Sequence, residues 1–338
     1  MLYRSALLFT LLLGTHVTAW GIDNGFPPLP VHTYSADSLA MAEVNFATPG
    51  DASAAVLNPS SMTATHRWMV MLGYALGWYE TLHFMDHETN HAVMHIPQLY
   101  VTGPLCDHLW VGVSFAPEKT MRVSVGPSTK FGNPAIREGY DIFVLKPSLA
   151  VKIIDELSVA GAFRCAYGRA YGGNYFKATE EGTDYGWEVS TTWNVSDSVR
   201  LAALYASALD VLPDDANREL PARNIRQTTK LGCDWQASDD WLLGVLVQKQ
   251  GDIGSSRHLA VGVGAKYNVS ETFRVMAGYT VESNFARVIG RYFNTVSTGV
   301  GKTFDSGTDL SLGFAFNSPH HGYSSSNYIW NFSLGQSF

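Results

Sequence analysis

The feature that most constrains this chain is a strict two-residue alternation between large apolar and small side chains, repeated along most of its length. In "WMVMLGYALGW" (Trp68–Trp78), one set of alternate positions holds only large apolar residues, and the other is small through its middle. Because successive side chains of a β-strand point to opposite faces, this period predicts a strand. The segment is also far shorter than the ~18 residues that a transmembrane helix needs.

Fourteen segments show this pattern, and they start near residues 66, 93, 108, 140, 155, 184, 198, 226, 240, 257, 271, 293, 308 and 327. Short connections such as "IIDE", "VSDS" and "ASDD" alternate with longer ones, at about 80–92, 117–139, 168–183, 208–225, 250–256, 283–292 and 317–326. An even strand count, alternating connection lengths and aromatic strand ends are typical of a transmembrane β-barrel. Such a sheet must close, because lipid cannot satisfy a free strand edge.

A soluble β-sandwich is the main alternative, since its strands alternate too. The side chains on its buried face are large, however, whereas the Gly, Ala and Ser side chains on one face of these segments are too small to fill a dry core. We therefore predict an all-β fold, a transmembrane antiparallel β-barrel of about 14 strands with an N-terminal hatch (plug) inside the lumen.

The start of the chain predicts export. Arg4 precedes the apolar run Ala6–Leu13, and small residues lead to Ala19, which is the pattern of a secretory signal peptide. We expect a signal peptide at 1–19, a hatch at 20–65 and the barrel at 66–338, in the cell outer membrane.

Composition excludes several functions. The formal net charge is −7, and an acidic exported protein is a poor candidate for binding nucleic acid. Three widely spaced cysteines, Cys106, Cys165 and Cys233, form neither a disulfide framework nor a metal motif.

The segment "GDASAAVLNPSSM" (Gly50–Met62) is small, almost uncharged and contains an Asn-Pro turn signal ahead of the first strand. Fourteen strands enclose a lumen too wide for the wall's own side chains to fill. A compact Ala/Ser-rich chain can occupy that space without burying charge. We interpret the segment as part of a plug, with a loose periplasmic leader as the alternative.

The stretch "SLAMAEVNFATPGDASAAVLNPSSM" (Ser38–Met62) resembles the hatch of the FadL family of outer-membrane long-chain fatty-acid transporters. Asp51, Ala52, Asn58 and Pro59 match the family pattern, and Ser60 replaces its usual Ala. Segments 184–205, 220–247, 267–283 and 296–316 are similar to consecutive family hairpins, so the resemblance covers most of the mature chain.

The resemblance implies a channel, not an enzyme, for passive uptake of hydrophobic small molecules such as fatty acids. It implies that the protein needs no cofactor and is a monomer surrounded by outer-membrane lipid. The ligand would pass a moving hatch or leave sideways. The expected hatch or gating residues are Asn58, Pro59 and Asp51, and Phe46 and Leu57 are candidates for the ligand path. Connections 117–139 and 168–183 leave little room for an outer binding groove, which suggests a smaller ligand or a rudimentary outer site.

A sideways exit requires a distorted strand. Pro97 and Pro147 each remove a backbone donor from the sheet ladder, so both are candidates for a gap, with a harmless bulge or strand end as the alternative.

The first long connection holds His83, His87, His91 and His95 at four-residue spacing, including a formal H-E-x-x-H match. On a helix this spacing can bind zinc, with Glu88 as a general base. A short barrel loop offers no catalytic domain, so loose metal binding or a solvated loop is a better interpretation. A further alternative for the whole chain is a PorV-like barrel that acts as a partner in protein secretion.

Overall fold

The computed structural model describes residues 35–81, 90–125, 136–172, 177–212, 225–251, 257–285, 291–320 and 327–338. The expected signal peptide and residues 20–34 of the expected hatch lie outside this part of the chain.

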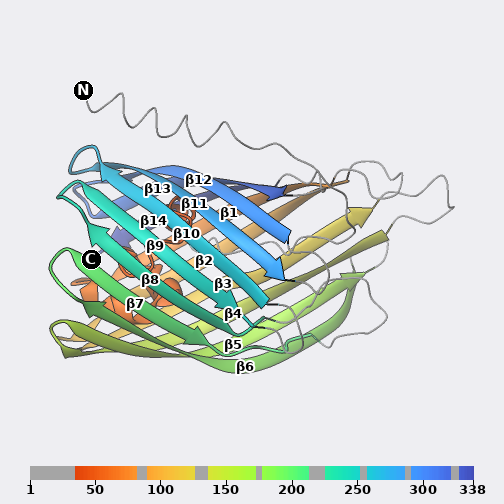
Figure 1. Ribbon diagram of the computed structural model, residues 1–338. Helices are drawn as coiled ribbons and strands as arrows, with labels where there is room; N and C mark the ends of the chain where they lie inside the picture. The colour runs from red at the N-terminus through yellow and green to blue at the C-terminus, as the bar shows by residue number, and fades with distance from the viewer. Residues whose placement is uncertain are drawn as a thin grey trace.

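The chain forms one closed antiparallel barrel, in which each strand pairs with its sequence neighbours and the first pairs with the last (Figure 1). The strands are β1 (Met69–Thr81), β2 (Asn90–Cys106), β3 (Leu109–Val125), β4 (Ile136–Ile154), β5 (Leu157–Gly172), β6 (Lys177–Asn194), β7 (Val199–Ala206), β8 (Thr228–Gln236), β9 (Trp241–Gln250), β10 (Arg257–Asn268), β11 (Phe273–Phe285), β12 (Arg291–Thr303), β13 (Thr308–His320) and β14 (Asn327–Ser337). The predicted fold class and all fourteen strands are confirmed.

Several strands run further than their sequence predicts. β3 continues to Val125 and β4 begins at Ile136, within the expected connection 117–139. β6 begins at Lys177 rather than near residue 184. These extensions carry charged residues, a composition that predicts a loop. Beyond the lipid layer a sheet needs no apolar outer face, so backbone pairing continues there without alternation.

The outer surface is apolar where a membrane would lie. Leu72, Leu149 and Leu231 are about half exposed, with relative accessibilities of 54%, 47% and 56%. Near the short turns, exposed aromatic side chains join the aliphatic ones, among them Trp68, Trp193, Trp235, Trp241 and Phe304. This arrangement of an apolar band and an aromatic girdle is that of a membrane-spanning barrel. Within the described residues no helix is long and apolar enough to cross a membrane.

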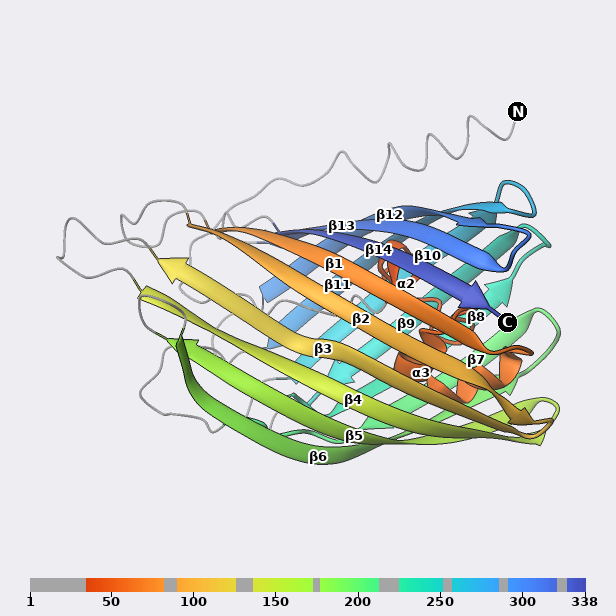
Figure 2. The same ribbon diagram turned by 180° about the vertical axis from the view of Figure 1, so that it is seen from behind.

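Three short helical segments lie inside the barrel at the end where the short turns and the C-terminus are found (Figure 2). They are α2 (Ala36–Ala40), α3 (Ala54–Leu57) and the 3-10 helix η1 (Pro59–Ala64). We call residues 35–65 the hatch. α2 packs against β11–β14, and η1 against β2–β6, so the hatch bridges the lumen.

Inward-facing glycines explain the small inner face. A Cβ atom on Gly244 would lie 2.6 Å from the Val44 carbonyl oxygen, and one on Gly264 would lie 2.6 Å from that of Met41. The wall therefore needs glycine where the hatch backbone approaches it.

A second segment also enters the lumen. The β6–β7 ladder covers only Glu188–Asn194 with Arg200–Ala206, after which the chain leaves the wall. Leu209, Val211 and Leu212 then pack inside against the apolar side chains of β4 and β5.

Candidate functional site: the hatch and the wall beside it

Side-chain hydrogen bonds shape two places in the hatch, the start of α2 and the turn before α3. The Ser35 hydroxyl accepts a hydrogen bond from the Ser38 amide at 3.1 Å, which caps α2. The Asp51 carboxylate accepts one from the Ser53 amide at 2.7 Å and another from its hydroxyl. Asp51, predicted as a hatch residue, thus shapes the turn that leads into α3.

Asn58 holds the hatch together. Its side chain is fully buried, and Nδ2 donates to the Phe46 carbonyl at 3.2 Å and to Thr192 Oγ1 in β6 at 2.9 Å. Its Oδ1 accepts from the Ser60 hydroxyl at 2.7 Å. Asn58 therefore joins two parts of the hatch to each other and to the wall.

Pro59 is the first residue of η1, a position where its missing amide is not needed. Ser60 contacts Thr192 through its hydroxyl at 2.7 Å, and its amide donates to Ser190 Oγ at 3.0 Å. Sequence reasoning singled out Asn58 and Pro59 but missed the wall residues that meet them.

Three cationic side chains of the wall fasten the hatch, two through ion pairs with hatch carboxylates and one through a hydrogen bond. Lys230 of β8 lies 3.1 Å from Glu43, and Arg274 of β11 lies 2.7 Å from Asp37. Lys146 of β4 donates to the Val56 carbonyl at 2.7 Å and pairs with Glu188 of β6 at 2.7 Å. The sequence analysis missed these residues, although a charge on an otherwise small inward face is a signal that an internal partner is required.

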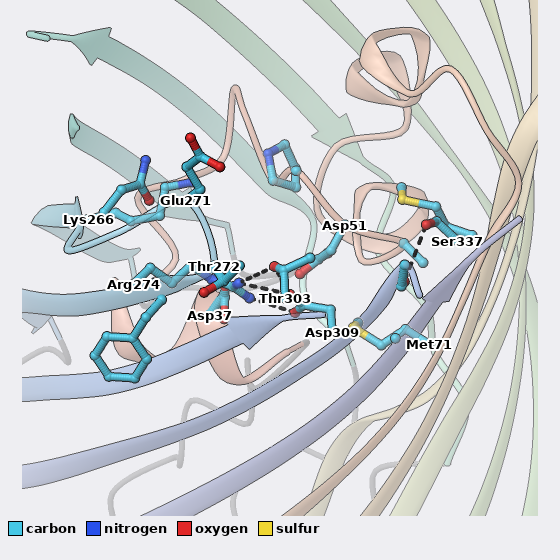
Figure 3. Close-up of a pocket in the computed structure, with 18 of the residues that line it drawn as sticks. Asp37, Asp51, Met71, Lys266, Glu271, Thr272, Arg274, Thr303, Asp309 and Ser337 are labelled. Carbon is cyan, nitrogen blue, oxygen red and sulfur yellow. Dashed lines mark hydrogen bonds and ion pairs between the residues drawn. The ribbon is translucent and has the colours of Figure 1, made fainter. Parts of the chain in front are cut away.

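Arg274 joins the hatch to the wall at a cavity of about 540 Å³ beside the short turns. Figure 3 shows its guanidinium between Asp37 and Asp309, with Asp51 facing the same space. The Arg274–Asp309 contact is 2.6 Å, so one cation serves a hatch carboxylate and a wall carboxylate. Burial and the neighbouring Asp37 carboxylate raise the pKa of Asp51 from 3.8 to about 6, against the lowering effect of the Ser53 hydrogen bonds.

The wall opens between β2 and β3. Their ladder covers only Leu99–Cys106 with Leu109–Phe115. Beyond Leu99, β2 stays paired with β1, while β3 beyond Phe115 stays paired with β4 and carries a bulge after Pro117. Figure 2 shows β2 and β3 separating away from the short-turn end.

Of the two prolines considered for a gap, Pro97 lies next to this opening, since it pairs with Tyr74 of β1 and has no partner in the β2–β3 ladder. Pro147 does not produce one. It pairs with Val113 of β3, and the β4–β5 ladder skips Lys146 and Pro147 but resumes at Ser148. Pro147 is therefore the local irregularity that we held as the alternative.

An apolar cluster forms the floor of the opening. Leu57 and Val56 of the hatch pack with Tyr100 of β2 and Ala116 of β3, together with Ala52 and Met71. Leu57, a predicted ligand-path residue, thus lies beside the gap. Phe46, the other candidate, lies across the hatch in a separate cluster with β7, β9 and β11.

The structure describes only part of the histidine cluster that was considered for metal binding. His83 and His87 lie outside the described residues. Glu88 also lies outside them, so the H-E-x-x-H match stays untested, while His91 and His95 belong to strand β2. Four residues along a strand span roughly 13 Å, too far for one metal ion. His95 is exposed and contacts the Tyr74 hydroxyl, and the described residues include no group of three potential metal ligands.

Taken together, the fold and the hatch define a plugged fourteen-stranded membrane barrel with an open side wall. No protein-family profile and no curated protein sequence match the chain. Among solved structures, it is similar to a Pseudomonas aeruginosa FadL homologue, with a TM-score of 0.75 and 15% identity over 92% of this chain and 100% of that one.

Two solved toluene transporters are also similar. TodX of Pseudomonas putida gives a TM-score of 0.72 at 13% identity, covering 95% of this chain and 99% of its own. TbuX of Ralstonia pickettii gives 0.66 at 11% identity, covering 90% and 98%. The chain has the fold of these FadL-type barrels, as its hatch and hairpins predicted.

Proposed function

We propose that this protein is an outer-membrane channel for passive uptake of small hydrophobic molecules, which leave the lumen sideways between β2 and β3. The carrying observation is the unpaired stretch of wall directly above an apolar cluster on the hatch. The solved structures of similar fold support this class of ligand, since two are described as toluene transporters. Uptake of long-chain fatty acids stays a prediction, which the uptake assay described below tests when a labelled fatty acid replaces toluene.

The alternative route, straight through the hatch, is chemically unsuited to an apolar ligand. It passes the ion pairs of Arg274 with Asp37 and of Lys230 with Glu43. Displacing the hatch there would separate buried charges from their partners, which costs several kcal/mol for each pair. Sideways exit leaves these contacts in place, and the ligand enters the bilayer without contacting water.

A reversible cross-link tests the route. Gln98 and Ala116 both face inward and occupy the first positions at which β2 and β3 are no longer paired. In a background without the native cysteines, we expect oxidation of a Gln98→Cys/Ala116→Cys pair to reduce uptake of labelled toluene several-fold, and reduction to restore it. The control is Ala150→Cys/Ala160→Cys, two inward alanines that face each other in the closed β4–β5 ladder.

Unchanged uptake through a barrel whose Gln98–Ala116 cross-link has formed would contradict sideways exit. Absence of uptake by the inserted, unmodified barrel would contradict the channel itself. A stable complex with a secreted protein would then favour the PorV-like adaptor role. We expect the active species to be a monomer. Chemical cross-linking of the protein in the membranes of the same cells, followed by measurement of its size, tests this.

A further inference from the structure

A second, smaller cavity of about 70 Å³ lies between the hatch and the wall formed by β9–β14. Leu39, Ala42 and Glu43 of the hatch form its floor. Ala42 and Glu43 both adopt the left-handed backbone conformation, with φ of 54° and 63°. Such a conformation is costly for residues other than glycine, and strained backbone concentrates at functional sites.

The wall of this cavity follows the sheet register. Gly262, Thr280, Thr295 and Asn317 are directly opposite one another on four successive strands, β10 to β13. Gly262 leaves the space open, because a Cβ atom there would lie 2.9 Å from Val44 and 3.2 Å from the Thr280 hydroxyl. The row thus forms a recess above the hatch.

Two oxygen atoms in this recess have no hydrogen-bond partner. Asn317 is only 6% exposed, and its Oδ1 is buried without a partner. Thr295 Oγ1, on the facing strand, is in the same state. A buried acceptor without a donor costs about 1–3 kcal/mol, so the site is built to receive one.

The charge of the recess also limits which ligand groups it can accept. Glu43 and Glu282 are both buried and both line it. Glu43 is paired with Lys230, which is outside the lining, and the described residues that line the recess include no lysine, arginine or histidine. An incoming carboxylate would meet two carboxyl groups and the acceptor Oδ1 of Asn317, whereas the Thr295 hydroxyl can either donate or accept. The other lining side chains include the apolar Leu39, Leu246 and Ile329.

We propose that this recess binds the hydroxyl or amino group of a small, mainly apolar ligand, such as a phenol or an aromatic amine, and disfavours carboxylates. About 70 Å³ suits a polar head group, and the apolar body of the ligand extends into the lumen above the hatch. A ligand hydroxyl donates to Asn317 Oδ1 and accepts from the Thr295 hydroxyl, and a ligand amino group can donate to both. This inference rests on the proposed function and names the ligand class for it.

The test compares three ligands that differ only in one substituent: toluene, 4-methylphenol and 4-methylbenzoate. Equilibrium binding of each labelled compound is measured on the full chain in lipid nanodiscs at pH 7, with empty nanodiscs subtracted. We expect 4-methylphenol to bind more tightly than toluene by roughly 3- to 10-fold, which corresponds to one hydrogen bond. We expect 4-methylbenzoate to bind more weakly than toluene.

Thr295→Val keeps the side-chain shape and removes the hydroxyl, and Asn317→Leu removes the amide. Each variant should reduce the ratio of 4-methylphenol to toluene affinity toward one while leaving toluene binding in place. Thr298→Val is the matched control, because Thr298 lies on the same strand but faces outward. Each variant is first shown to be folded by its unchanged gel mobility before boiling.

A wild-type ratio near one, or a ratio that both variants leave unchanged, would overturn the inference. Toluene uptake by cells is measured in parallel. Uptake without any preference for 4-methylphenol would overturn this inference alone, and a 4-methylphenol preference in a protein that takes up no toluene would overturn the proposed function alone.

Discussion

At the scale of single residues, the hatch depends on a few side chains that bridge distant parts of the chain. The Asn58 side chain makes three hydrogen bonds, to Phe46, Ser60 and Thr192. Asn58→Ala would leave the Phe46 carbonyl without this donor, at a cost of about 1–3 kcal/mol to hatch seating. We expect faster amide hydrogen exchange over residues 58–64.

The control for this variant is Asn45→Ala in the same hatch, because the Asn45 Oδ1 atom has no hydrogen-bond partner. Equal exchange in the two variants would show that the Asn58 bonds do not hold the hatch.

Asp51 makes the stability of the seated hatch depend on pH, and the environment of its carboxyl group fixes the sign. Its pKa is about 6 with the hatch seated and 3.8 when the residue is free in water, so the seated hatch favours the protonated acid. The hatch is therefore most firmly held at the lower end of this window, and loses stability as the pH rises from about 4 to 6, with no further change from this group above that. The protection factors of residues 51–57, from which the intrinsic rise of the exchange rate with pH is divided out, should fall across this window.

Asp51→Asn should remove that dependence, because the amide does not ionise. Asp37 and Asp309, which share the cavity and pair with Arg274, are left intact in this variant and serve as the internal reference. A pH profile identical to wild type would assign the transition to another group.

At the scale of elements, the strands of the wall are shaped to receive the hatch. Gly264→Ala would place a Cβ atom 2.6 Å from the Met41 carbonyl, and either the hatch or β10 must move. Overpacking of this kind costs about 1–3 kcal/mol. We expect hatch amides to exchange faster while the barrel strands stay protected.

Gly161→Ala in β5 is the matched control, because nothing lies within 4 Å of the added atom. If the two substitutions have the same effect on hatch exchange, close approach of the hatch is not what requires Gly264.

At the scale of the whole molecule, the barrel closes without help from the hatch. β1 and β14 pair from Met69↔Ser337 to Tyr79↔Asn327, and all fourteen strands have wall neighbours on both sides. We expect a variant without residues 35–65 to insert into membranes and to form a permanently conducting pore, whereas the intact chain conducts little. Single-channel recording in planar bilayers measures this difference.

A truncated chain that fails to assemble would show instead that the hatch is part of the folding core. An assembled but non-conducting pore would mean that other residues, such as the in-folded Leu209–Leu212 segment, close the lumen.

The sequence by itself determined the barrel, because lipid enforces a simple rule at every position. Outward side chains must be large and apolar, so each strand is visible in its own residues. The same applies to the hatch turn, since Pro59 begins η1 and the Asn58 side chain accepts a hydrogen bond from Ser60 two residues on.

Only the tertiary structure decided how the parts meet. Arg274 and Asp37 are separated by 237 positions in the chain, and Lys230 and Glu43 by 187, and no local pattern links such pairs. The opening between β2 and β3 is equally invisible in sequence, because Pro97 and Pro147 remove the same backbone donor. Closure of the sheet fixes which neighbour each strand edge meets, and that geometry made one proline the border of a gap and the other a minor irregularity.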